Sequence, residues 1–498
     1  MFEPTESLVK GQRAIEAFRF EEARVAYSKA LEFAPDSIDA LRGLGYSLLQ
    51  LGNLRGSLDV LERALRLDPS DLLSSLLMGR LCLRLQQPGG AEQHFRAILT
   101  RIPTSEAARS GLIDALVAQG DLTAARAHSD SLLKHNPDSE VGHLAAARLA
   151  GFERDDLRAL GHFDRLVQAH PGSPVHRYNR GLCLLRLGRF AEGWRDYEFR
   201  FASGAVDLRM PATPRWDGRP TERLLVIAEQ GLGDAILFSR FIDDAAQLAQ
   251  EIVLACPDSL AGLLGRNLSV ACVSDRAQAW PEHDAYVPLM SLPHVLQLGD
   301  AAAVARPRYL QADPERKARW SAALAASNLP RIGIVHATSA AHSTEQNPFT
   351  RRSRRAADLD PILQGGEVVA YNLNLGRPAE QARSELPVLR DLPDEIEDFD
   401  DTAAVVSLLD AVISVDTACA HIAGAVGTPL FLLLPQTPDW KWQPSKQDAP
   451  WYPSMRRFTH APAPGWSDSV RSAILRASKK GSALRRSVSR AADAANDQ

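Results

Sequence analysis

Hydrophobic and polar positions along the chain follow two different patterns, and the change falls near residue 205. In the first two hundred residues, apolar side chains recur with the spacing of amphipathic helices, and each second helix is followed by a proline that stops it. These prolines stand 34 residues apart, at Pro35, Pro69, Pro103, Pro137 and Pro171. The period predicts stacked helix pairs, because a single pair cannot bury its own apolar face.

Two further columns of residues keep this period. A small residue, which lets paired helices approach closely, recurs at Ala23, Ser57, Ala91, Ala125 and Ala159. A large side chain, which fills the gap between helices, recurs at Tyr27, Leu61, Phe95, Phe163 and Tyr197, and Ser129 interrupts the series. The pattern resembles the tetratricopeptide repeat, with about six units over residues 1–204. Such an array binds a peptide or protein on its concave face, or serves as a rigid spacer or dimerisation arm.

Beyond residue 205 the apolar positions form short continuous runs. Residues 205–221 contain three prolines and predict a linker. The runs that follow cover residues 224–228, 251–255, 269–273, 331–335, 367–371, 412–415 and 429–434. Apolar strands of this length that alternate with helices predict parallel sheets.

The polar, alanine-rich stretch 311–329 separates these runs into two groups. We therefore expect two doubly wound α/β domains, at residues 222–310 and 330–466, with a cleft between them. Residues 467–498 predict a basic helix or tail, for which contact with an anionic membrane surface is a weaker alternative.

Composition narrows the class of protein only slightly. With 498 residues, of which 45% are hydrophobic and 24% charged, the chain has the balance of a soluble globular protein of two or three domains. A net charge of −4 gives no reason to expect a nucleic-acid partner. The apolar runs are far shorter than the roughly 20 residues of a membrane span, and no signal peptide is visible. Five scattered cysteines without a CxxC pair favour a reducing cytoplasm.

The first chemical signal is the segment Glu229-Gln-Gly-Leu-Gly-Asp234, between a predicted strand and a predicted helix. It has two glycines of the dinucleotide fingerprint GxGxxG but Ile236 in place of the third, so a nicotinamide cofactor is not expected. A carboxylate at the helix start also disfavours a pyrophosphate there. Asp234 is therefore either a helix-capping residue or a general base held at a cleft, and the two alternatives differ in where its carboxylate points.

The second signal lies in residues 412–435, where a buried strand runs into Asp416 and Thr417 and then into a helix rich in small residues. Free backbone N–H groups near Thr417 and Ala418 suit a diphosphate, provided that Asp416, the expected helix cap, points away from it. His421 lies one turn later on the same face. The alternative is a core helix with a hydrogen-bonded histidine.

Two loops carry weaker signals. The arginine-rich loop 342–355, which includes Arg351 and Arg354, is a candidate phosphate clamp or simply a solvated basic loop. The tryptophan-rich loop 435–455, which includes Trp440 and Lys441, could wall a nucleobase pocket or cover the end of the sheet.

Taken in order, residues 216–220, 224–236, 400–442 and 449–458 resemble the bacterial tetratricopeptide glycosyltransferases, whose catalytic half is similar to the lipopolysaccharide heptosyltransferases. The resemblance implies a tetratricopeptide solenoid followed by a two-domain GT-B module. It also implies an inverting, metal-independent transferase with no cofactor, a nucleotide-diphosphate sugar on the C-terminal α/β domain and an acceptor against the N-terminal one. Asp234 matches the family's proposed base, and Asp416, Thr417 and His421 match its diphosphate-contacting segment.

The chain departs from these relatives near the expected donor pocket. His336-Ala-Thr-Ser339 stands where relatives have a Trp-Ala-Gly-Asn-like turn, and residues 371–375 read YNLNL where relatives often have Ser-Leu-Gln. Either the donor differs or the pocket has lost its function.

We therefore predict a cytoplasmic transferase of hexose, heptose or nonulosonic acid, acting on a protein presented by the repeats, such as flagellin or another surface protein, with lipopolysaccharide as the second choice. Asp234 is the expected catalytic residue. The expected substrate-binding residues are Gln230, Gly231, Gly233, His336, Arg351, Arg354, Asp416, Thr417, Ala418, His421, Trp440 and Lys441. The alternative is a non-catalytic scaffold with a degenerate GT-B domain. A sugar-nucleotide epimerase ranks last, since it would not need the solenoid.

Overall fold

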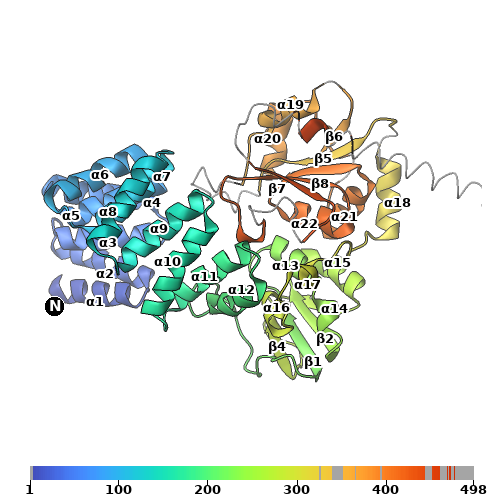
Figure 1. The fold of residues 1–498 in the computed structure, drawn as a ribbon, viewed down its shortest axis with the longest axis horizontal. Coiled ribbons are helices and arrows are strands. Elements are labelled where there is room, and N and C mark those ends of the chain that lie inside the picture. Colours follow the sequence, from blue (N-terminus) through green and yellow to red (C-terminus); the bar gives the residue numbers. More distant parts are fainter. Residues whose placement is uncertain are drawn as a thin grey trace, which may run out of the picture. The chain divides into compact units, whose positions relative to one another are not determined.

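The computed structural model describes residues 4–324, 327–338, 352–364, 366–392, 395–442 and 451–459, together with 468, 470–472 and 476. Contacts between residues divide the chain into two compact units, one up to Ala169 and the other from His170 onward. The first unit is all-helical, and the second begins with two helices and continues into two α/β domains (Figure 1).

The first unit consists of five helix pairs. These are α1 (Pro4–Glu16) with α2 (Phe20–Phe33), α3 (Ile38–Gln50) with α4 (Leu54–Leu67), α5 (Leu72–Arg84) with α6 (Pro88–Arg101), α7 (Glu106–Ala118) with α8 (Leu122–His135), and α9 (Glu140–Phe152) with α10 (Asp156–Ala169). The side chains that cap the later pairs recur with the sequence period: Ser37, Asp71, Ser105 and Ser139 each accept a hydrogen bond from the backbone N–H three residues on. The predicted array of helix pairs is confirmed.

The large side chains Tyr27 and Phe95 also pack against the next helix pair, where each meets a glycine outside the small-residue column. A Cβ atom added to Gly43 would lie 2.3 Å from the Tyr27 ring, and one added to Gly111 would lie 2.4 Å from the Phe95 ring. The large residue of each of these two repeats therefore lies directly against a glycine in the next repeat. A methyl group at either position would require the ring to move.

The second unit opens with a sixth helix pair and a four-stranded sheet. The pair is α11 (Pro174–Arg186) with α12 (Phe190–Tyr197). The N-terminal α/β domain contains β1 (Thr221–Ile227), α13 (Leu232–Ser239), α14 (Ile242–Ala245), β2 (Ala249–Cys256), α15 (Asp258–Leu268), β3 (Ala271–Ser274), β4 (Ala285–Pro288), α16 (Leu292–Val295) and α17 (Ala301–Val304). All its strands are parallel, in the order β3-β2-β1-β4.

The C-terminal α/β domain carries a five-stranded parallel sheet in the order β6-β5-β7-β8-β9. After the connecting helix α18 (Pro314–Ala323) come β5 (Arg331–Val335), α19 (Asp360–Leu363), β6 (Val369–Asn372), α20 (Arg377–Glu385), α21 (Phe399–Leu408), β7 (Ala411–Val415), α22 (Ala418–Val426), β8 (Leu430–Leu434), the 3-10 turn η5 (Trp440–Trp442) and β9 (Met455–Thr459). Two parallel α/β sheets in succession are consistent with a GT-B module.

Every apolar run expected to be a strand overlaps an observed strand, but two observed strands were not expected. Both are edge strands, β4 and β9. The first is only four residues long and ends in a proline, and the second contains Arg456 and Arg457. The two arginines interrupt the apolar run of β9, and the proline of β4 disfavours a strand in sequence-based reasoning.

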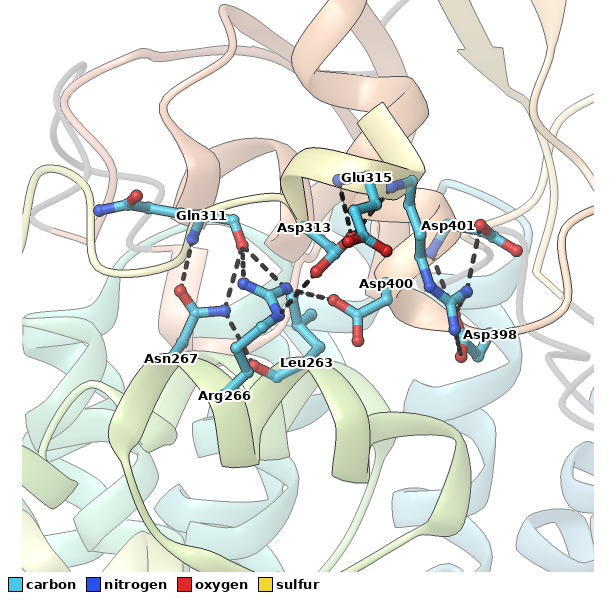
Figure 2. Close-up of polar contacts among 10 residues, drawn as sticks. Leu263, Arg266, Asn267, Gln311, Asp313, Glu315, Asp398, Asp400 and Asp401 are labelled. Carbon is cyan, nitrogen blue, oxygen red and sulfur yellow. Dashed lines mark hydrogen bonds and ion pairs between the residues drawn. The ribbon is translucent and has the colours of Figure 1, made fainter. Parts of the chain in front are cut away.

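Charged side chains join the two α/β domains where the connecting segment passes between them (Figure 2). Arg266 of α15 pairs with Asp400 of α21, and its guanidinium also donates to the Gln311 carbonyl at 3.2 Å. Asp313 caps α18, from which Arg316 reaches back to Asp398 at 2.8 Å. The connecting segment is therefore bound to both domains.

Candidate functional site

The first candidate element is the turn between β1 and α13. Gln230 has a φ of 68°, a left-handed conformation that a side chain rarely adopts. Gly231 then caps the helix, and Asp234 in the first turn accepts a hydrogen bond from the Gly231 N–H at 3.4 Å through Oδ2. The capping alternative for Asp234 is thus present in the structure.

The other carboxylate oxygen of Asp234 points to the C-terminal domain. Its Oδ1 lies 3.1 Å from the Lys441 ammonium, which also lies 3.1 Å from Asp439. Burial alone would lower the pKa of Lys441, but the charges of Asp234, Asp439 and Asp416 outweigh this effect and raise its pKa well above the ordinary value. A buried, charged lysine therefore spans from Asp439 to Asp234 between the two domains.

The second element is the start of α22. Thr417, and not Asp416 as expected, caps this helix: its hydroxyl accepts from the Ala420 N–H at 3.4 Å and contacts the Ser414 hydroxyl at 3.0 Å. Asp416 lies one residue before the cap, and its carboxylate lies beside His421 instead. Thr417 and Ala418 are half-buried, so the helix start is partly open to solvent.

Asp416 and His421 form a buried pair beside this helix start. Nε2 of His421 lies 3.7 Å from Asp416, and its Nδ1 lies 2.9 Å from the Tyr452 hydroxyl. Burial raises the pKa of Asp416, but the hydrogen bond from His421 and the charges of Lys441 and Arg352 together hold it well below its ordinary value. The almost fully buried His421 is therefore hydrogen-bonded to Tyr452 on one side and faces the Asp416 carboxylate on the other.

Gly233 brings the two elements together. A Cβ atom at this position would lie 2.7 Å from the His421 ring, so α13 can approach α22 this closely only with glycine here. As a result, Gly231, Gly233, Asp234, Asp416, Thr417, Ala418, His421 and Lys441 lie in one region of the second unit.

His336 and Arg354 contact backbone carbonyls and each other rather than the residues around Asp234. His336 is fully buried, with one ring nitrogen 2.8 Å from the Arg354 carbonyl and the other 3.1 Å from the Pro378 carbonyl. Burial lowers the pKa of Arg354 to about 10. Of the arginine-rich loop, Arg352 is the side chain that reaches Asp416, at 3.8 Å. Arg351 lies outside the described residues.

Trp440 and Gln230 contact the sixth helix pair. The Trp440 ring packs 5.6 Å from the rings of both Trp194 and Tyr197. The Gln230 side-chain amide donates to the Tyr197 hydroxyl at 2.7 Å. Trp440 thus packs on the sixth helix pair rather than on the end of the sheet.

Several residues of this region were not among the expected site residues. Asp439 and Tyr452 come from the tryptophan-rich loop, and Tyr197 and Arg200 come from the end of the sixth repeat. Sequence spacing cannot pair them with α13 or α22, because the contacts join distant segments. One signal was available for Arg200, which falls in a repeat position that is apolar in every other unit.

Comparisons with known proteins agree with this architecture. Residues 14–81 and 82–149 match one tetratricopeptide repeat model, residues 144–196 match another, and residues 397–458 match the model of glycosyltransferase family 9 (heptosyltransferase). The chain therefore combines tetratricopeptide repeats with a family 9 glycosyltransferase segment. That segment contains Asp416, Thr417, His421 and Lys441.

One curated relative aligns with this chain over most of the length of both proteins. Protein FlbA of Caulobacter vibrioides is 28% identical over 527 residues, an alignment that covers 90% of this chain and 85% of FlbA. Among solved structures, a tetratricopeptide repeat protein from Parabacteroides merdae aligns over 40% of this chain and 79% of its own, with 18% identity and a TM-score of 0.32. MamA from Desulfovibrio magneticus aligns over 33% of this chain and 93% of its own, with 19% identity and a TM-score of 0.29.

In the part of the chain that the structure describes, no helix is both long and apolar enough to cross a membrane.

Proposed function

We propose that this chain is an inverting glycosyltransferase that moves a sugar from a nucleotide-diphosphate donor to a hydroxyl group of a protein acceptor. The family 9 match supports the glycosyltransferase class. The observation that carries the finer proposal is the 3.1 Å contact between Asp234 and Lys441. It joins the turn of one α/β domain to the family 9 segment of the other, where a GT-B enzyme would hold its donor.

In the proposed reaction, Asp234 takes the proton of the acceptor hydroxyl while the oxygen attacks the anomeric carbon. The bond from this carbon to the diphosphate oxygen breaks on the opposite face, and its electron pair leaves with the nucleoside diphosphate. The partly open helix start at Thr417 and the cations Arg352 and Lys441 would offset the charge of the leaving group. No metal or cofactor is needed in this scheme.

The Asp234–Lys441 ion pair affects the order of steps in this mechanism. If Asp234 takes up a proton, the buried Lys441 charge loses one of its carboxylate partners, which is unfavourable inside a protein. A donor diphosphate bound near Lys441 would take the place of Asp234 as the partner of this lysine. The negative charge of the diphosphate grows as the bond to the sugar breaks. We therefore propose that donor binding precedes proton transfer.

A groove in the first unit supports a protein acceptor. It has a volume of about 560 Å³, and its lining combines aliphatic side chains, among them Leu73 and Leu77, with Arg80 and with Arg42, which pairs with Asp39. Such a surface fits a polypeptide segment with apolar and acidic side chains. Flagellin or another surface protein is our first choice of acceptor, and lipopolysaccharide is the second. Five free cysteines are consistent with a cytoplasmic setting.

The experiment begins with a strain that lacks the gene. Mass spectrometry of its flagellin, other surface proteins and lipopolysaccharide identifies the molecule that loses a glycan, and this unmodified molecule is then purified as the acceptor. A panel of nucleotide sugars is tested with the full-length chain for thermal stabilisation and for transfer. A donor at 100 times its Kd should stabilise the chain by about 2.7 kcal/mol.

The Asp234→Asn variant tests the base. It should lose about 10²- to 10⁴-fold in transfer rate while donor stabilisation is retained. Asp258→Asn is the matched control, because Asp258 also starts a helix after a parallel strand of the same domain. If no nucleotide sugar stabilises the chain or is consumed, the transferase proposal fails and a scaffold role is favoured. Transfer by Asp234→Asn at the wild-type rate would show that Asp234 is not the base.

A further inference from the structure

The sixth repeat differs from the other five at a buried position. Arg200 continues a column of residues spaced 34 apart. The other five members are apolar: Ala30, Ala64, Ile98, Leu132 and Leu166. All of these residues are buried, and Arg200 itself is 0% exposed. An arginine in an apolar column is unfavourable unless it is fully paired, so its partners indicate why it is there.

Those partners lie beside the turn that carries Asp234. The Arg200 guanidinium donates to Glu229 at 2.8 Å, to the Ser291 hydroxyl at 2.7 Å and to Glu198 of its own helix end at 2.8 Å, and its central carbon lies 4.1 Å from the Phe201 ring centroid. Glu229 is fully buried and also accepts the Met290 N–H at 3.2 Å. It immediately precedes Gln230, the residue with the left-handed φ.

Tyr197 gives a second, independent contact from the same repeat. Its repeat position holds large side chains that fill the gap between helices, and Tyr27 is the equivalent residue of the first repeat. In the sixth repeat the ring does the same, but its hydroxyl also accepts a hydrogen bond from the Gln230 amide at 2.7 Å. Two successive residues of the turn, Glu229 and Gln230, are thus bound by one helix end.

We propose that Tyr197 and Arg200 are positioning residues for the transfer reaction, which hold the turn 229–233 in its strained conformation so that Asp234 faces the C-terminal domain. The proposal rests on the proposed function. Neither residue touches the reacting atoms. They act through Gln230 and Glu229, whose backbone sets the position of α13. The sixth repeat is then a working part of the transferase as well as the last unit of the solenoid.

The consequence for the reaction follows from geometry. A shift of the base by about 1 Å lowers the rate of a positioned proton transfer by up to about 10²-fold, even when the substrate still binds. The left-handed Gln230 would relax if its side chain lost the Tyr197 hydroxyl. The loss should therefore appear in kcat and not in the KM of the donor.

The first test is Tyr197→Phe, which removes one oxygen atom and keeps the ring. We expect kcat for sugar transfer to fall at least about tenfold, with an unchanged donor KM. Tyr286→Phe is the control, since it makes the same change at a buried tyrosine of β4, in an apolar cluster with Leu225 and Ile227 that contains none of the site residues, and its kcat should equal that of the wild type. Equal kcat values for Tyr197→Phe and the wild type would overturn the role of Tyr197.

The second test separates positioning from stability. Arg200→Leu with Glu229→Gln restores the apolar repeat residue and keeps an acceptor oxygen for the Met290 N–H. Replacing a buried ion pair in this way often leaves stability unchanged or raises it. Glu198, the other carboxylate paired with Arg200, keeps Arg215 as its cation in this variant. We expect a melting temperature at or above that of the wild type, but a kcat at least about tenfold lower. A stable double variant with wild-type kcat would overturn the role of Arg200.

The outcomes also separate this inference from the proposed function. If the wild type transfers sugar and both variants do so at its rate, only the positioning role fails. If the wild type transfers sugar to no acceptor and releases no nucleoside diphosphate, both proposals fail together. If the double variant loses activity only in proportion to its loss of folded protein, as judged by circular dichroism, Arg200 is structural and the positioning role is again overturned.

Discussion

The helices α13 and α22 each have an aspartate at their start, but the two aspartates differ in position and exposure. Both follow a buried parallel strand, β1 or β7. In α13 the cap is a glycine, and Asp234 lies inside the first turn with its side chain 16% exposed. In α22 a threonine caps the helix, and Asp416 lies outside it with its side chain 5% exposed.

The difference shows how the same residue type is suited to two tasks. Asp416 is fixed by His421 and has a strongly lowered pKa, so it stays charged and contributes a constant field. Among the described residues, Lys441 on the other domain is the charged partner of Asp234. In the proposed mechanism, Asp234 gives up this partner when the donor binds. The comparison predicts that changes at the two helix starts will have effects of different kinds.

The largest effect is expected at Lys441, which contacts both domains. Lys441→Met leaves the largely buried Asp234 without its cation and removes one of the positive charges near Asp416, at a cost of about 3 to 5 kcal/mol in the free energy of unfolding. Lys441→Arg keeps the charge and should retain most of the stability. Urea denaturation of both variants provides the measurement. Equal stability of Lys441→Met and the wild type would mean that the pair contributes little.

Asp416→Asn should have the next largest effect, and its effect should depend on pH. Removing a charged hydrogen-bond partner from His421 should lower the free energy of unfolding by about 2 to 3 kcal/mol at pH 7. Because the folded pKa of Asp416 is depressed, its contribution is complete above the unfolded value of about 4 and is lost as the pH falls below it. The stability difference between wild type and variant should therefore shrink from pH 5 toward pH 2 in denaturation curves. A constant difference would contradict the charged role of Asp416.

Gly233→Ala tests how closely the two helix starts approach. The added methyl group would lie 2.7 Å from the His421 ring, so we expect a loss of about 1 to 2 kcal/mol and a lower transfer rate. Gly231→Ala is the control, because its methyl group would meet only Asp234, at 3.3 Å. Thermal unfolding and transfer assays compare the two. If both variants behave alike, contact with His421 is not what requires glycine.

The smallest effect is expected at the cap of α22. Thr417→Ala removes the hydroxyl that accepts the Ala420 N–H, which should lower the free energy of unfolding by about 1 kcal/mol. Ser173→Ala removes the same kind of cap from α11. If the α22 start also contacts the donor, only Thr417→Ala should raise the donor KM. An equal donor KM in both variants would limit Thr417 to capping.

The sequence predicts the features that depend on residues close along the chain. The repeat period locates the helix pairs, and continuous apolar runs locate the strands that are buried on both faces. The edge strand β9 is missed because it contains polar side chains and therefore has no continuous apolar run. The choice of Thr417 over Asp416 as the cap was also missed, since the two residues are adjacent and both residue types cap helices.

The candidate site is predictable only in part, for a related reason. Gly233 and Asp234 stand out because a glycine turn with an acid is unusual at a helix start. Their partners Lys441 and His421 come from about 200 residues away, and no local rule relates these positions. The pairing of Lys441 with Asp234 could be found only once the two domains were folded together.

The recurring caps Ser37, Asp71, Ser105 and Ser139 have a consequence for how such a chain can change in length. Each cap belongs to a unit that ends where the next begins. Loss of one 34-residue unit would keep equivalent caps but set the Tyr27 ring against Leu77, whereas loss of two successive units would set it against Gly111. The reach of the solenoid is therefore free to vary in evolution by pairs of units, whereas the unit containing Arg200 has no interchangeable copy.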